Sequence, residues 1–134
     1  MRHLPSPARS RLLSSALAAF ALMGGSAAFA HAKLVSSSPP AEAKVSDVKT
    51  ISLTFSEGLI EKMSGIDLVM TGMPGMANHA PMAVSGFKTA VGAEGRMLTV
   101  TLPRALPVGT YTLKYHAVTA DTHRVEGSYS FSVK

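Results

Sequence analysis

Apolar and polar residues alternate with a period of two in four long stretches of the chain, and this pattern limits the possible folds more than any other feature. In the last stretch Tyr129, Phe131 and Val133 alternate with serines. Successive side chains of a β-strand point to opposite faces, so each stretch predicts a strand with one buried face. The apolar positions of the other stretches are Ile51, Leu53 and Phe55, then Leu98, Val100 and Leu102, then Tyr111, Leu113, Tyr115 and Ala117.

Shorter strands are expected over residues 33–36, 66–70 and 82–91, and turn residues rich in Pro and Gly separate the strands. No segment keeps a sustained apolar period of 3.6 residues. Short strands at a spacing of roughly ten residues are typical of antiparallel sandwiches and barrels. The sequence therefore predicts an all-β fold, a single β-sandwich or Greek-key barrel, without a second domain.

Residues 1–30 have the features of a cleaved secretory signal peptide. They combine a start with three arginines, an apolar run over residues 12–23 and an A-x-A cleavage site at residues 28–30. The apolar run is shorter than the roughly 20 residues of a membrane-spanning helix. We expect a mature domain of residues 31–134 that starts with His31 and is not embedded in a membrane.

The composition of the mature part narrows both the partners and the metal chemistry. It carries ten Lys and Arg against eight Asp and Glu, a formal charge of +2, so no nucleic-acid binding is expected. The chain has no cysteine, which excludes disulfides and also a blue-copper site, because that site needs a thiolate. Any bound metal must be held by nitrogen, oxygen or thioether sulfur.

Three residues supply the ligands of a candidate Cu(II) site. After cleavage the α-amine and Nδ1 of His31 can chelate one ion, and both nitrogens suit Cu(II), which stands at the top of the divalent affinity order. Asp121 and His123, spaced i, i+2, would point to the same side of an extended segment. Three nitrogens and one oxygen favour a tetragonal Cu(II) site over a structural zinc site.

The segment VMTGMPGMANHAPM in the middle of the chain holds four methionines and a histidine. Met73, Met76 and Met82 lie among Gly, Pro and Asn, as expected of a surface loop. Met70 continues an inward-facing strand pattern and can equally belong to the core. Thioethers together with one imidazole, His79, suit Cu(I), which prefers soft sulfur ligands. A methionine-rich apolar patch for a partner protein is the alternative.

Three motifs in this order resemble the CopC/PcoC family of periplasmic copper-binding, copper-resistance proteins over residues 31–134. They are HAKLVSSSPP at the mature start, LVMTGMPGM followed by a histidine and PMAV, and AVTADTH followed by GSYSFSVK. The resemblance implies a seven-stranded Greek-key sandwich, cupredoxin-like or immunoglobulin-like, with two copper sites at opposite ends. It places Cu(II) at His31, Asp121 and His123, and Cu(I) at His79 with a subset of Met70, Met73, Met76 and Met82.

The resemblance also implies a periplasmic carrier for copper resistance and homeostasis. Its ligands would be copper ions, Cu(II) and Cu(I), and it would exchange them with a multicopper oxidase and an inner-membrane copper transporter. No enzymatic activity is expected, because the sequence shows no grouping of nucleophile, base and orienting residue.

The sequence departs from the family pattern at three places. The spacing from Met76 through His79 to Met82 is one residue longer than in the best-known members. The sequence therefore does not show which methionines converge with His79. Tyr115 stands where tryptophan is common, and His116 stands where arginine is frequent. His116 lies on the polar side of its strand, so we expect a solvated side chain, with an auxiliary metal ligand as the alternative.

Two other functions compete with copper carriage. A copper oxidase of the lytic polysaccharide monooxygenase kind also uses an N-terminal histidine chelate. Against it, Asp121 would occupy an equatorial position that oxygen needs, and the few aromatic residues lie mostly at inward strand positions. An immunoglobulin-like adhesion module would leave the methionine-rich segment unexplained.

Overall fold

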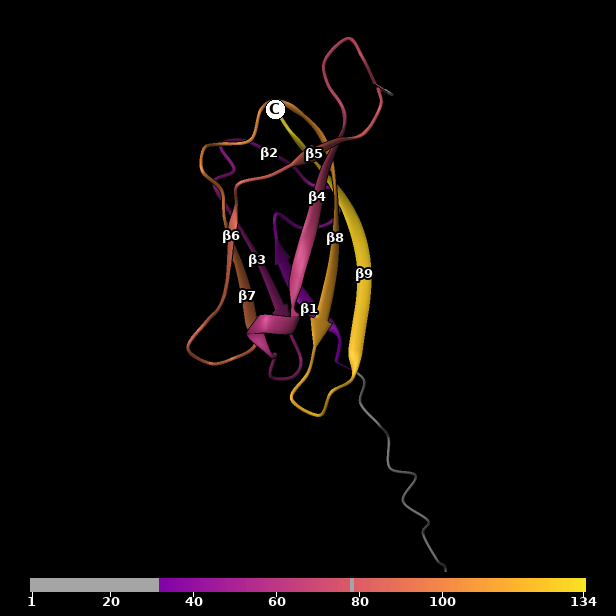
Figure 1. Cartoon of the computed structure of the whole chain (residues 1–134). Coiled ribbons are helices and arrows are strands. Elements are labelled where there is room, and N and C mark those ends of the chain that lie inside the picture. The colour runs from indigo at the N-terminus through magenta and orange to yellow at the C-terminus, as the bar shows by residue number, and fades with distance from the viewer. Residues whose placement is uncertain (1–31, 78) are drawn as a thin grey trace, which may run out of the picture.

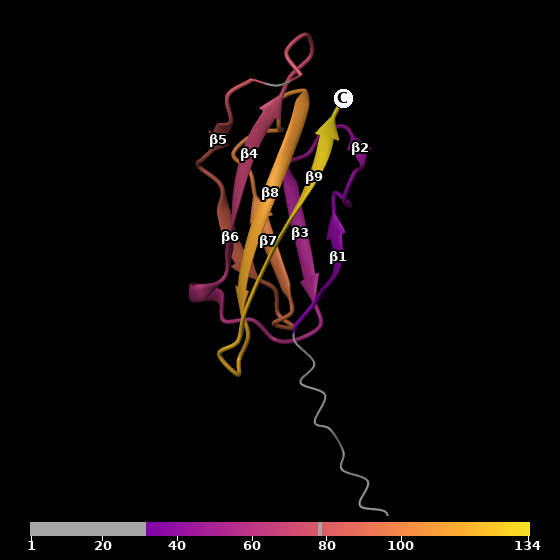
Figure 2. The same cartoon turned by 90° about the vertical axis from the view of Figure 1, so that its right-hand side faces the viewer.

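The computed structural model describes residues 32–77 and 79–134, and this part of the chain forms a β-sandwich (Figures 1 and 2). Its elements are β1 (Leu34–Ser38), β2 (Lys44–Val45), β3 (Thr50–Phe55), a short 3-10 helix η1 (Glu61–Met63), β4 (Gly65–Gly72), β5 (Met82–Val84), β6 (Lys88–Val91), β7 (Met97–Thr101), β8 (Gly109–Val118) and β9 (Arg124–Val133). Seven of the described strands have four residues or more, and the short β2 and β5 lie at sheet edges. The all-β prediction is confirmed.

The strands form two sheets, with the orders β1-β3-β7-β6 and β2-β9-β8-β4-β5. Neighbouring strands are antiparallel, except for β2, which runs parallel to β9. The chain changes sheet repeatedly, for example between β3 and β4 and between β7 and β8, so strands that are neighbours in the sequence are often not neighbours in a sheet. This is the Greek-key arrangement that the sequence predicted.

The core lies between the sheets and is built from the alternating apolar positions. The most deeply buried large side chains are Tyr111, Phe55, Phe131, Ile51, Leu53, Leu68, Leu98, Leu113, Val100 and Thr119. Each fully buried aliphatic or aromatic side chain contributes about 1.5–3 kcal/mol of hydrophobic stabilisation. A slip of one residue would turn a strand's apolar side chains to solvent, so the alternation also fixes the register.

The expected strand over residues 82–91 is in fact two strands that belong to different sheets. β5 pairs with β4, whereas β6 pairs with β7. Gly86 lies between them with a φ of +82°, a left-handed conformation that favours glycine. The chain therefore crosses from one sheet to the other at this glycine.

The strand directions place the connections at two opposite ends of the sandwich. The histidine end carries the connections from β3 to β4, from β6 to β7 and from β8 to β9. The methionine end carries the connections from β1 to β3, from β4 to β5 and from β7 to β8, and the β4–β5 connection extends well beyond the strands (Figures 1 and 2). At about 3.3 Å per residue, the ten-residue strands β8 and β9 separate the two ends by roughly 30 Å. No helix in the described ranges is long and apolar enough to cross a bilayer.

Candidate metal sites

The connection from β8 to β9 is a tight turn that holds Asp121 and His123 next to each other at the histidine end. The backbone N–H of Thr119 donates to His123 O at 2.9 Å, and that of Thr122 donates to Thr119 O at 2.8 Å. Thr122 has a φ of +70°, so the segment is a turn and not the extended stretch assumed from the sequence spacing. The expected convergence of the two side chains nevertheless occurs.

Three hydrogen bonds hold the carboxylate of Asp121. Oδ1 accepts bonds from the hydroxyl of Thr119 and from the backbone N–H of His123 (3.3 Å), and Oδ2 accepts a bond from His123 Nδ1 (2.7 Å). The Thr119 hydroxyl, followed by the imidazole of His123, lowers the pKa of Asp121 to about 2. Asp121 is therefore anionic near neutral pH, and 55% of its side chain is exposed to solvent and ions.

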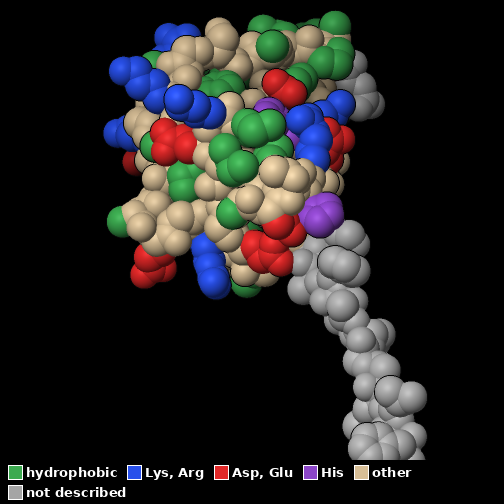
Figure 3. All heavy atoms as spheres, turned by 60° about the horizontal axis from the view of Figure 1, so that its bottom comes forward, with side chains coloured by type: hydrophobic (Ala, Val, Ile, Leu, Met, Phe, Trp, Pro, Cys, Tyr) green, Lys and Arg blue, Asp and Glu red, His purple; other side chains and the backbone are tan. Residues whose placement is uncertain are grey.

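Asp121 also determines which nitrogen of His123 carries the lone pair. When Nδ1–H donates to the carboxylate, the lone pair of the neutral ring is on Nε2. Metal-binding histidines commonly show this arrangement, in which the second ring nitrogen donates to a carboxylate or carbonyl oxygen. Figure 3 shows a histidine beside acidic side chains on the surface at this end.

The third predicted Cu(II) ligand, His31, lies outside the described residues. The next residue, Ala32, is buried, and Lys33 N donates to Ser56 Oγ while Ser56 N donates to Lys33 O, both at 2.9 Å. The chain therefore enters the sandwich at the histidine end. Within residues 32–77 and 79–134, no three His, Cys, Asp or Glu side chains form a group that could hold a metal ion. Asp121 and His123 are thus the part of the predicted Cu(II) site that lies within the described residues.

Thr119 is the residue of this site that the sequence did not indicate. Its side chain is buried, and its hydroxyl lies within hydrogen-bonding distance of both the Asp121 carboxylate and the His123 carbonyl. The only signal in the sequence is a hydroxyl residue two positions before an aspartate, which is common in turns.

Met73 and Met76 form a pair across a two-residue turn at Pro74 and Gly75. Met73 N donates to Met76 O at 3.0 Å, and Met76 N donates to Met73 O at 2.9 Å. Gly75 has a φ of +81°, and proline suits the turn position before such a glycine. Directly opposed residues of an antiparallel pair project to the same face, with Cβ atoms about 5 Å apart. The two thioethers therefore leave the turn side by side.

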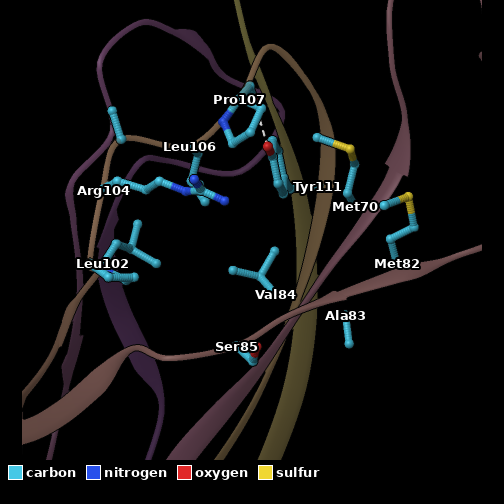
Figure 4. A pocket seen from close by; sticks show the side chains of 12 residues that line it. Met70, Met82, Ala83, Val84, Ser85, Leu102, Arg104, Leu106, Pro107 and Tyr111 are labelled. Atoms are coloured by element: carbon cyan, nitrogen blue, oxygen red, sulfur yellow. Dashed lines mark hydrogen bonds between the residues drawn. The ribbon is translucent and has the colours of Figure 1, made fainter.

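Met70 and Met82 form a second pair, because they lie opposite each other in β4 and β5. Met70 is buried, whereas Met82 is 54% exposed. Both line a cavity of about 490 Å³ between β5 and the β7–β8 connection, and Figure 4 shows the two sulfurs close to Tyr111 on one side of it.

The structure thus sorts the four methionines into two cross-strand pairs. Met73 differs from the expected loop residue, because it is half-buried and packs against the core. Met76 and Met82 are exposed, as expected, although Met82 belongs to a strand. Met70 belongs to the core, which its strand pattern allowed.

His79, in the β4–β5 connection, repeats the nitrogen arrangement of His123. Its Nδ1 lies 2.7 Å from Ala80 O, so the ring N–H donates to that carbonyl. Its Nε2 is buried and has no hydrogen-bond partner among the described residues. A buried polar atom without a partner costs about 1–3 kcal/mol, so an ion bound at Nε2 would remove this penalty.

His116 is more enclosed than the solvated side chain predicted for it. It is half-buried on the outer face of the five-stranded sheet, opposite Glu126 of β9 and Gly65 of β4. A Cβ at Gly65 would lie 3.2 Å from His116 Cε1, so the glycine makes room for the imidazole. Asp67 and Lys114 line the same shallow cleft.

Comparison with known proteins shows that this chain is similar to copper resistance proteins. A family model described as the CopC domain matches residues 34–134. Copper resistance protein C of Escherichia coli is 45% identical over 107 residues, with 80% of this chain and 84% of the relative covered. For copper resistance protein C of Xanthomonas campestris pv. juglandis the identity is 49% over 114 residues, with 85% and 88% covered.

Two solved structures agree with the fold. The crystal structure of PcoC, a methionine rich copper resistance protein from Escherichia coli, has a TM-score of 0.70 at 43% identity and covers 78% of this chain and 100% of its own. CopC from Methylosinus trichosporium OB3b has a TM-score of 0.63 at 32% identity and covers 78% of this chain and 94% of its own.

Proposed function

This chain belongs to the CopC family, and from that premise we propose that it is a periplasmic copper-binding carrier for copper resistance and homeostasis. One observation carries the proposal. His123 and His79, at opposite ends of the sandwich, each hold Nδ1 against an oxygen, which leaves the lone pair on Nε2. One lies beside a carboxylate and the other in a methionine-rich connection, so the two ends suit different oxidation states of copper.

At the histidine end, the proposed Cu(II) ligands are His31, Asp121 and His123. The α-amine and Nδ1 of His31 would add two nitrogens to Nε2 of His123. Asp121 would add a charged oxygen once its carboxylate turns from Nδ1 of His123 to the ion. Such a set suits Cu(II) in a tetragonal geometry. The site would form only after cleavage after residue 30, because the amine of His31 is otherwise part of a peptide bond.

At the methionine end, His79 and a subset of the four methionines are the proposed Cu(I) ligands. Met76 and Met82 are exposed, so their sulfurs can reach an ion without disturbing the core. Met73 leaves the turn on the same side as Met76. Met70 would have to leave its packed position, so it contributes least to the proposed site.

Location and partners follow from the same proposal. The signal peptide at residues 1–30 would export the protein, and the mature domain of residues 31–134 would bind copper in the periplasm. A multicopper oxidase and an inner-membrane copper transporter are the proposed exchange partners.

We propose binding rather than catalysis as the role of the copper. A polysaccharide oxidase needs a flat aromatic face near its copper, whereas Tyr111 is fully buried and Tyr115 and Tyr129 are partly buried. Asp121, an anion beside His123, would take a copper position that oxygen needs.

The proposal is tested by titration of the protein that begins at His31. Cu(II) is added in air and Cu(I) is added without oxygen, each in competition with a chromophoric chelator. We expect one equivalent of each ion per chain. If the copper-loaded protein oxidises a polysaccharide in the presence of a reductant and oxygen, the carrier proposal is wrong and the protein is an oxidase.

A further inference from the structure

We propose that the cavity beside Met70 and Met82, together with Arg104, is a docking site for an acidic partner protein that inserts an aliphatic side chain. The purpose of docking, copper exchange, rests on the proposed function. The geometry of the docking site does not, so the two can be tested separately.

The cavity has an apolar interior of a size that suits a side chain from another molecule. Its volume of about 490 Å³ lies in the range of roughly 300–1,000 Å³ typical of small-molecule pockets, so it has room for at least one aliphatic side chain. Leu102 and Leu106 form one wall, and Val84 forms the other (Figure 4). The hydroxyl of Tyr111 donates to Pro107 O at 2.5 Å, so the polar atom of the largest lining side chain is already satisfied. An aliphatic side chain is therefore the group that gains most from entering.

Arg104 adds a positive charge to this apolar cavity. Its side chain extends over the cavity toward Tyr111 in Figure 4, and the residue is exposed. The structure shows no ion pair or hydrogen bond of its guanidinium with any described residue. A guanidinium in this position favours a carboxylate next to the inserted aliphatic group, because it can bind the two oxygens together.

The charged side chains of the methionine end also favour an acidic partner. Its connections and adjoining strand ends carry five basic side chains against two acidic ones, namely Lys44, Lys49, Lys88, Arg104 and Lys134 against Glu42 and Asp47. The histidine end carries four basic side chains against five acidic ones, namely Lys33, Lys62, Arg96 and Arg124 against Glu57, Glu61, Glu94, Asp121 and Glu126. An acidic protein surface would therefore be attracted to the methionine end more than to the other.

The position of Met82 connects the docking site with copper transfer. Met82 lines the cavity, is half exposed and is one of the proposed Cu(I) ligands. A partner seated in the cavity would bring its own soft donor next to the bound ion. Copper would pass by ligand exchange, as one Cu–S bond to this chain breaks while a bond to the partner forms, with no change in oxidation state.

The test uses the copper-free mature protein and a synthetic peptide, acetyl-Glu-Asp-Leu-Asp-Glu-amide, followed by amide NMR shifts. We expect shifts at Val84, Leu106 and their neighbours that saturate at millimolar peptide and weaken as salt rises, since a Debye length is about 10 Å at 0.1 M. A peptide with Ser in place of Leu, and one with Lys in place of the acids, should bind at least several-fold more weakly.

Two variants and a matched control locate the site. Arg104→Glu should weaken peptide binding by roughly tenfold, whereas the same charge reversal at the opposite end, Lys62→Glu, should change it less than about twofold. Ser85→Trp, at an exposed cavity position, should also weaken peptide binding, because the bulky ring would block insertion of the leucine. Equal binding by all these variants, or shifts confined to the histidine end, would overturn the proposal.

The other possible occupants of the cavity are distinguishable. If the protein dimerises at high concentration and Ser85→Trp abolishes the dimer, the occupant of the cavity is a second copy of this chain. Equal binding of the serine peptide would show a purely electrostatic surface. Each result would overturn the docking proposal. Absence of Cu(I) binding in the wild type would instead overturn the proposed function, because the peptide test needs no copper.

Discussion

Oδ2 of Asp121 lies 2.7 Å from Nδ1 of His123, and the hydroxyl of Thr119 holds the other oxygen of the same carboxylate. A single buried threonine therefore orients the acid, and the acid in turn orients the imidazole. Because the three groups lie within five residues of one turn, each can be changed without altering a strand.

The first prediction concerns the pKa of Asp121. Thr119→Val removes the largest cause of its shift, so the pKa should rise from about 2 toward the ordinary value of 3.8. An NMR titration that follows the carboxyl carbon measures this directly. An unchanged pKa would mean that His123 alone holds the carboxylate.

The sign of the stability effect follows from the same shift. The folded-state pKa is lower than the unfolded one, so Asp121 stabilises the folded protein above pH 3.8, and this contribution is lost as the pH falls toward 2. Thr119→Val should reduce the pH dependence of the urea midpoint in this window. Between pH 5 and pH 2 the urea midpoint of the wild type should therefore fall further than that of the variant, and equal falls would contradict the assignment.

The second prediction is that maturation creates the Cu(II) site. One glycine added before His31 blocks the α-amine as a ligand, so Cu(II) affinity should fall by more than the roughly 10–100-fold loss typical of an outer-shell change. The thermal unfolding midpoint and the Cu(I) affinity should stay the same. Competition with a chelator measures both affinities. An unchanged Cu(II) affinity would show that the α-amine of His31 is not a ligand.

The third prediction separates the two ends. Asp121→Ala and His123→Ala should impair Cu(II) binding and leave Cu(I) binding intact, because the ends of the sandwich are about 30 Å apart. Both residues are exposed, so the fold should tolerate the changes. The readout is the affinity of each variant for each ion. A parallel loss of Cu(I) affinity would indicate one shared site.

The fourth prediction uses the different burial of the methionines. Met76→Leu combined with Met82→Leu should lower Cu(I) affinity sharply with little change in the free energy of unfolding, since both side chains are exposed. Met70→Leu is the matched control, a volume-conserving change in the core that should cost under about 1.5 kcal/mol and change Cu(I) affinity less. Chelator competition and urea unfolding measure the two quantities. Equal Cu(I) affinity in the double variant and the wild type would contradict the ligand role.

Local sequence patterns predicted the strands because burial acts on alternate residues. Phe131 and Val133 face the core as their alternation indicated. The change of sheet at Gly86 was not predicted, because an alternating pattern looks the same on either side of a crossover. The pairing of Met70 with Met82 was likewise hidden, because register depends on where two strands meet in space.

The donor types of the candidate site residues could be predicted from the sequence, but their burial and contacts could not. Imidazole, carboxylate and thioether donors are visible in the sequence. The Asp121–His123 contact was expected, but a turn produces it and not the extended segment that the spacing suggested. The role of Thr119 and the burial of Met73 depend on tertiary packing, which residue type alone does not show. The enclosure of His116 has the same origin, because Gly65 comes from a strand about fifty residues earlier in the chain.

The proposed function requires that one chain binds Cu(II) and Cu(I) at separate sites. The most direct test loads the mature protein with one equivalent of Cu(I) and then one of Cu(II) without oxygen, followed by copper analysis, EPR and copper-edge X-ray absorption. We expect two copper ions per chain, a tetragonal EPR signal with nitrogen coupling, and Cu–S scattering from the Cu(I) ion. Displacement of the first ion by the second, or a Cu(I) form without Cu–S scattering, would contradict it.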